Sequence, residues 1–126
     1  MSEDVTVGLV RALIQNLKGA PEDWAAFALV LELDGQKVSA VHGFAYSADG
    51  AASGAAASPS SIRPAVAAYT DSHYSPEQPL PVALLVQFDR TNGRDEVTFE
   101  DTDRGRWKVT PANFSTIRHE LRPQFS

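Results

Sequence analysis

Charged side chains gather in the last third of the chain, between residues 89 and 107, where carboxylates outnumber guanidinium groups. Such a cluster can dock a basic protein partner through steered association and charge-assisted hydrogen bonds. The same charges can also form a solvated sheet edge that discourages aggregation, and the sequence supports both interpretations equally. For Trp107, at the end of this stretch, core packing is the competing interpretation. The residues predicted to contact a partner are Asp89, Asp95, Glu96, Glu100, Asp101, Asp103 and Trp107.

Catalytic patterns are missing from the sequence. His42, His73 and His119 are scattered without the i, i+4 spacing of a metal site. No Gly-x-Ser-x-Gly elbow presents a serine nucleophile, and Gly50 and Gly54 lack the following lysine of a phosphate loop. The sequence therefore predicts a protein that is not an enzyme and that needs no metal or cofactor. An enzyme that uses His42 or His119 with a carboxylate remains a weaker alternative.

Composition narrows the class of protein further. A chain of 126 residues can bury one sizeable core, so a single domain over residues 1–126 is expected. The absence of cysteine excludes disulfides and thiolate metal sites. No basic and apolar leader opens the chain, and no apolar run approaches the ~18 residues that span a bilayer, so we expect a cytoplasmic protein without a membrane partner.

The net charge bears on the partner. Sixteen acidic against eleven basic residues give a net charge of −5, which has the wrong sign for binding nucleic acid through its phosphates. A basic protein partner matches this charge better. The alternative is that a modest negative charge simply keeps a small protein in solution.

Periodicity predicts the elements of the first half. Apolar residues recur at helical spacing over residues 4–18, which indicates an amphipathic helix covering a sheet. Residues 24–33 and 36–46 alternate as strands, so an antiparallel hairpin is expected. In the second strand, alternate residues from Val38 to Tyr46 are assigned to one face. The Ala/Ser/Gly tract at 47–61 offers little to bury, and we predict a mobile loop there.

The second half predicts a second strand pair closed by helices. Residues 62–73 favour a short helix, and residues 82–89 form a strand that is apolar on both faces and therefore central. Asn92-Gly93 should turn the chain into a strand at 96–101, and residues 106–109 can add a short one. Thr110 should cap a closing helix in which Phe114, Ile117 and Leu121 form a buried stripe beside the first helix.

These elements define an α+β fold: one antiparallel sheet of four to five strands with helices packed on one face. The two strand pairs supply the sheet, and the amphipathic helices at the two ends of the chain supply its cover. The charged cluster then falls on the turns and on the polar face of the last long strand.

The order of these elements also carries a family resemblance. A helix, the run Pro21-Glu22-Asp23-Trp24 before a strand, a hairpin, a variable middle, Glu96-Val97-Thr98-Phe99-Glu100 and then Arg106-Trp107 resemble the YezG-type and wider contact-dependent growth inhibition immunity proteins. The similarity spans most of the chain through short, degenerate motifs. The tract at 47–61 and the helix after Pro111 depart from a pattern that ends in strands, which leaves the subfamily open.

The resemblance implies a small bacterial cytosolic protein that binds and neutralises a cognate toxin domain, commonly a nuclease. Inhibition would work by occluding the active site of the toxin, without a cofactor. The alternative from another class is a secretion chaperone or assembly subunit, which would bind an unfolded segment in an apolar groove. Gene order separates the two, because an immunity gene should follow a large secreted toxin gene.

Overall fold

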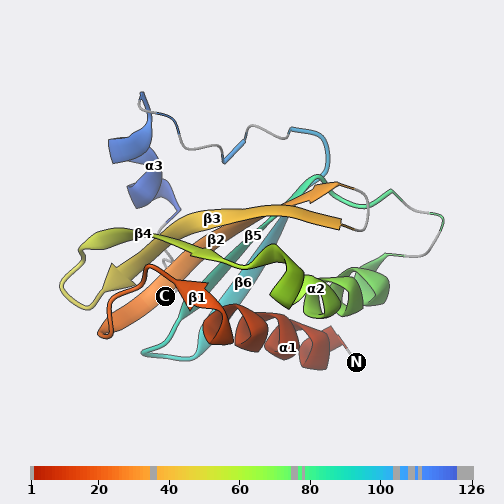
Figure 1. Ribbon diagram of the computed structural model, residues 1–126, viewed down its shortest axis with the longest axis horizontal. Helices are drawn as coiled ribbons and strands as arrows, with labels where there is room; N and C mark the ends of the chain where they lie inside the picture. Colours follow the sequence, from red (N-terminus) through yellow and green to blue (C-terminus); the bar gives the residue numbers. More distant parts are fainter. Residues whose placement is uncertain are drawn as a thin grey trace.

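The computed structural model describes residues 2–34, 37–74, 77, 79–103, 106–107, 110 and 112–121. In these ranges the chain forms one antiparallel sheet of six strands in the order β1-β4-β3-β2-β5-β6, with three helices (Figure 1). The α+β fold class is confirmed, with a sheet slightly larger than expected. The elements are α1 (Ser2–Gln15), β1 (Leu17–Lys18), β2 (Trp24–Asp34), β3 (Lys37–Ser47), β4 (Ala52–Ala57), α2 (Pro59–His73), β5 (Ala83–Asp89), β6 (Arg94–Glu100) and α3 (Phe114–Glu120).

One face of the sheet packs against α1 and α2 (Figure 1). Odd-numbered residues of β2 point to this side, and Phe27, Leu29 and Leu31 are fully buried there. Leu9 and Leu13 of α1 meet them, because the two lie one helical turn apart on the same face of that helix. We call this cluster the first core.

The opposite face carries a second core, and here the expected arrangement of helices is wrong. Ile117 and Leu121, at the closing helix, pack with Trp107 over Val30 and Leu85, on the far side of the sheet from α1. Figure 1 shows α3 across the sheet from α1 and α2. The reason lies in β2 and β5, which are apolar on both faces and therefore need cover on both. The side chain of Phe114 lies outside the described residues.

A bulge in β3 shows that the alternate residues from Val38 to Tyr46 do not all share one face of the sheet, contrary to the prediction. Leu33 pairs with Val38 and Glu32 pairs with Ala40, so one extra residue, Ser39, stands in β3. Val38 consequently belongs to the first core, whereas Phe44, farther along the same strand, belongs to the second. A one-residue shift moves every following side chain to the other face.

The tract at 47–61 is not one mobile loop, because Ala52–Ala57 forms β4 and pairs with β3 and β1. Small side chains suit this place in the sheet. Ala55 and Ala57 are 7% and 3% exposed under the helices. Gly19 has a φ of +84°, and a Cβ placed on it would lie 2.6 Å from the Gly54 carbonyl oxygen. The small side chains of β4 therefore let neighbouring backbone, such as that of Gly19, approach closely, although they bury little apolar area.

The closing helix begins at Phe114, later than predicted, so Thr110 is not its N-cap but belongs to the turn before it. A reciprocal pair of hydrogen bonds closes that turn. The Asn113 backbone N–H donates to Thr110 Oγ1 at 3.3 Å, and the Thr110 N–H donates to Asn113 Oδ1 at 2.7 Å. The short strand expected at 106–109 is wrong in its first half, where Arg106 and Trp107 form a turn. Lys108, Val109 and Pro111 lie outside the described residues.

Candidate functional site

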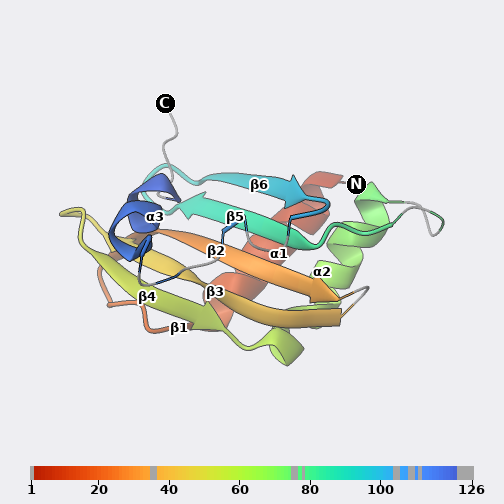
Figure 2. The same cartoon turned by 90° about the horizontal axis from the view of Figure 1, so that it is seen from above.

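β6 forms one outer edge of the sheet, beside β5 (Figure 2). Its first residues, Arg94, Asp95 and Glu96, are exposed. Asp95 lies on the side of the first core, whereas Glu96 and Glu100 lie on the side of the second, because side chains alternate along a strand. The acidic residues therefore share an edge of the sheet and not a face.

Asp89 shapes the turn that leads into this edge. Its Oδ1 accepts hydrogen bonds from the Thr91 N–H at 2.9 Å and from Thr91 Oγ1 at 2.5 Å. Asn92 Oδ1 accepts from the Arg94 N–H at 2.9 Å, and Gly93 adopts a φ of +72°. The Asn92-Gly93 turn is thus confirmed, and Asp89 is committed to it, which leaves its carboxylate less available to a partner.

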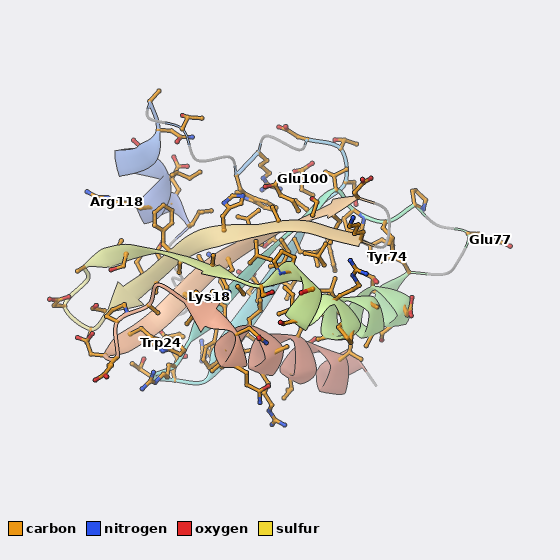
Figure 3. The ribbon with its side chains drawn as sticks, viewed as in Figure 1. Lys18, Trp24, Tyr74, Glu77, Glu100 and Arg118 are labelled. Carbon is orange, nitrogen blue, oxygen red and sulfur yellow. The ribbon has the colours of Figure 1, made fainter. Side chains whose placement is uncertain are left out.

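Glu100 organises the loop after β6. Its carboxylate accepts hydrogen bonds from the Asp103 N–H at 3.1 Å, the Thr102 N–H at 3.3 Å and Arg106 at 2.9 Å. The N–H of Asp103, then that of Thr102 and the Arg106 guanidinium, lower the pKa of Glu100. Figure 3 shows Glu100 on the same side of the sheet as Arg118 of α3. This residue holds the loop on which Asp101 and Asp103 are exposed.

Replacing Glu100 with glutamine should therefore loosen this loop and remove a pH-dependent part of the stability. A carboxyl whose pKa is lowered on folding stabilises the fold above its ordinary value of 4.5, and this contribution is lost as the pH falls through the folded-state pKa. The variant should lose stability at pH 7 and should differ less from the parent at pH 3. Denaturant midpoints from pH 7 to pH 3 measure this, with Glu96→Gln as the control of equal charge. Equal midpoints for the parent and Glu100→Gln at pH 7 would contradict the assignment.

The two tryptophans pack against neighbouring side chains. Trp107 is 7% exposed within the second core, so little of it is open to a partner. Arg106 stacks over that ring at 4.7 Å from its centroid. Trp24 packs on Phe27 and Phe88, with ring centroids 5.8 and 6.2 Å away. Packing in the second core is therefore the role that the structure gives Trp107.

An aromatic cluster, which was not predicted from the sequence, lies on the face of β6 that belongs to the first core. Phe99 lies 6.1 Å from Tyr69, 5.9 Å from His73 and 5.6 Å from Tyr74, measured between ring centroids. Burial raises the pKa of both tyrosines, and the carboxylates of β6 and its loop add to that rise. Only the i, i+4 spacing of Tyr69 and His73 at the end of a helix signals the cluster in sequence.

Two carboxylates of β6 and its loop act on this cluster. Asp95 raises the pKa of Tyr69, and Asp101 raises that of Tyr74, in each case after burial. Asp101 also lines a cavity of about 280 Å³ with Tyr74, Pro79 and Leu80. The aromatic patch of His73, Tyr74 and Phe99, with Asp101 beside it, thus combines aromatic rings with a negative charge at the edge of the sheet. Asp95 lies on the same face of β6, four residues before Phe99.

A histidine and a carboxylate also meet on the second face of the sheet. His42 Nε2 lies 3.1 Å from Glu32 Oε2, and their side chains are 31% and 35% exposed. A proton can pass within such a pair. Among the described residues, no group of three histidine, aspartate or glutamate side chains is placed to hold a metal ion. The side chain of His119 lies outside those residues.

An apolar groove of about 260 Å³ runs between α1 and the β5–β6 turn. Val7 and Ile14 on α1 are 49% and 37% exposed, and Phe88 of β5 lines the same groove. Arg11 and Asp95 place one charge of each sign in its lining. No helix among the described residues is long and apolar enough to cross a membrane.

Comparison with known proteins yields no match: no family model, curated protein or solved structure resembles this chain closely enough to be recognised. The site therefore has to be interpreted from its own geometry. That geometry is a small α+β domain with an acidic outer strand, an ordered acidic loop and an aromatic patch between them.

Proposed function

We propose that this protein is a cytoplasmic immunity protein, which binds and neutralises a cognate bacterial toxin domain by occluding its active site. The observation that carries the proposal is the charge of the β6 edge. Five carboxylates stand against one guanidinium in residues 94–103, in a chain whose net charge is −5. Asp95, Glu96, Asp101 and Asp103 of this segment are exposed.

A nuclease toxin is the partner that this charge suits best. Nucleases bind the phosphates of their substrates with lysine and arginine, so their active-site surfaces are basic. An acidic surface is attracted to such a site over a distance and associates with it rapidly. The order of Glu100 and its loop favours this function, because groups fixed before binding lose less entropy when they bind.

Reversing the charge of the edge tests the proposal. Glu100 is unsuitable because it organises its loop, so the variant replaces Asp95, Glu96 and Asp101 with lysine. The association rate with the toxin should fall about tenfold or more at low salt and should lose most of its dependence on ionic strength. Stopped-flow binding across a range of salt concentrations measures both. The toxin for this experiment is the product of the adjacent gene, identified by copurification.

The matched control changes the net charge equally on other elements. Asp34, Glu77 and Glu120 are exposed and lie outside β6 and its loop. Replacing these three with lysine should slow association much less than the edge variant. An edge variant that associates as fast as the parent, or a control that slows association equally, would contradict the placement of the interface.

The apolar groove favours a second candidate, a secretion chaperone or assembly subunit. Its exposed Val7 and Ile14 resemble the anchoring surface that an amphipathic or unfolded segment needs. A chaperone would retain an unfolded effector segment, whereas an immunity protein would bind a folded toxin and abolish its activity. An activity assay of the copurified partner, with and without this protein, distinguishes the two functions.

A further inference from the structure

The backbone of β5 shows which groups of β6 face outward. The Arg90 N–H donates to the Ala25 oxygen at 2.7 Å, and the Leu33 N–H donates to the Val82 oxygen at 2.9 Å. The even-numbered residues of β5 therefore direct their backbone groups toward β2. At the start of the strand Val82 is shared, because its N–H donates to the Glu100 oxygen of β6 at 2.8 Å. Hydrogen bonding alternates from residue to residue in an antiparallel ladder, so the odd-numbered residues of β5 bond to β6.

The register then assigns each residue of β6. Gln87 pairs with Glu96 and Leu85 pairs with Thr98, so these even-numbered residues of β6 bond inward to β5. Asp95, Val97 and Phe99 consequently turn their N–H and C=O groups away from the sheet. No strand lies beyond β6 in the part of the chain that the structure describes (Figure 2).

An edge of this kind accepts one more strand. Outward N–H and C=O groups at alternate residues pair with the backbone of an extended segment, as in β-strand addition. A residue of that segment opposite Phe99 would lie on the same face as Phe99, with Cβ atoms about 5 Å apart. It would therefore reach His73 and Tyr74, whose rings lie 5.9 and 5.6 Å from Phe99.

The side chains around this position select a cation. The rings of the aromatic patch attract lysine or arginine, and Asp101 supplies a carboxylate beside Tyr74 for a charge-assisted hydrogen bond. Asp95 lies four residues before Phe99 on the same face of β6, where it can meet a second cation of the added strand. On the other face of the added strand, Glu96 would meet the alternate side chains. A second copy of this chain fits less well, since its own edge carries the same excess of carboxylates.

We propose that the partner contributes an extended segment rich in lysine or arginine, which adds to the outer edge of β6 and seats a cation over the Phe99 patch. The inference rests on the proposed function in one respect, namely that both require a basic protein partner. It goes further by naming the backbone groups that bind and the conformation of the bound segment.

A synthetic octapeptide of alternating lysine and threonine tests the inference directly. The peptide should slow amide hydrogen exchange at Asp95, Val97 and Phe99 about tenfold or more, since it covers these amides. Two control peptides carry glutamate in place of lysine, or N-methyl groups on alternate amides. Both should fail to protect these amides, the first through charge repulsion and the second through loss of strand pairing.

A pair of variants at one position separates charge from backbone pairing. Asp95→Asn and Asp95→Pro both remove the carboxylate, but only proline also removes the outward N–H. Proline is tolerated at a sheet edge where its N–H faced solvent, and thermal unfolding verifies that both variants fold. Asp95→Pro should bind the lysine peptide about tenfold more weakly than Asp95→Asn.

Three results would overturn the inference: equal binding by the two Asp95 variants, equal binding of the N-methylated peptide, or protection of the edge amides by self-association without peptide. These outcomes are independent of the proposed function. A toxin that binds and responds to charge reversal while the edge amides stay unprotected would refute strand addition alone. Peptide binding with the expected protection, alongside an adjacent gene product that does not bind, would refute the immunity function alone.

Discussion

Gly43→Ala should destabilise the protein by about 3 kcal/mol or more, or prevent folding altogether. Gly43 lies in β3 between β2 and β4, opposite Leu29 and Ala55. A Cβ at this position would overlap the Ala28 carbonyl oxygen and stand 3.0 Å from the Leu29 Cα. Both atoms belong to the backbone of the neighbouring central strand, so relief requires movement of β2 itself, which both cores hold in place.

Gly54→Ala is the matched control, because it makes the same substitution in the adjacent strand. A Cβ on Gly54 would meet no atom within 4 Å. Its effect should remain within about 1 kcal/mol, with a gain possible from the reduced freedom of the unfolded chain. Denaturant unfolding of the two variants compares them. Equal midpoints would show that β2 and β3 are not as close at Gly43 as the structure places them.

The strand pairs could be predicted because their signals are local. β2 and β3 alternate clearly, and β5 and β6 are joined by Asn92-Gly93, whose preferred backbone conformation is that of a turn. β4 could not be predicted in this way. Alanine, serine and glycine show no alternation, and this tract becomes a strand through backbone pairing with β3 and β1, which its own side chains do not signal.

The face that each element covers depends on contacts between distant segments. The stripe formed by Ile117 and Leu121 shows that α3 buries one side, but it does not identify the surface that α3 meets. The sequence held a second signal, since Val82 to Asp89 is apolar on both faces and requires two covers. The extra residue Ser39 in β3 has no such signal, because a bulge follows from the pairing of both strands.

The candidate site was predicted as a group of acidic residues, and the structure separates their roles. Asp89 and Glu100 order a turn and a loop through backbone N–H groups two and three residues away, and such a role depends on the local conformation. Asp101 instead lies beside the aromatic patch, and Asp95 lines the apolar groove beside α1. The patch itself joins α2 to β6, and sequence periodicity within either element cannot reveal that contact.

Leu121→Ala should cost roughly 2 to 5 kcal/mol, a large share of the stability of a domain of this size. Leu121 is 3% exposed and packs in the second core with Ile117 and Trp107. Its carbonyl oxygen accepts a buried hydrogen bond from Gln87 Nε2 at 2.7 Å, and Tyr46 Oη donates to the Arg118 oxygen at 2.6 Å. These two bonds hold the end of α3 against β5 and β3, so the cavity left by alanine cannot close by moving the helix.

Two other substitutions in the same region give smaller expected losses of stability, with which the loss in Leu121→Ala can be compared. Thr110→Ala removes the hydrogen bond that Thr110 Oγ1 accepts in the turn before α3 and should cost about 1 kcal/mol. Glu120→Ala changes an exposed residue and should change stability by less than about 0.5 kcal/mol. Thermal or denaturant unfolding ranks the three variants, and binding to the copurified partner is measured on each. If Leu121→Ala unfolds like the parent yet loses the partner, α3 is the recognition element. The assignment of the interface to the β6 edge would then be wrong, because Leu121 would contribute to partner binding and not to the stability of the fold.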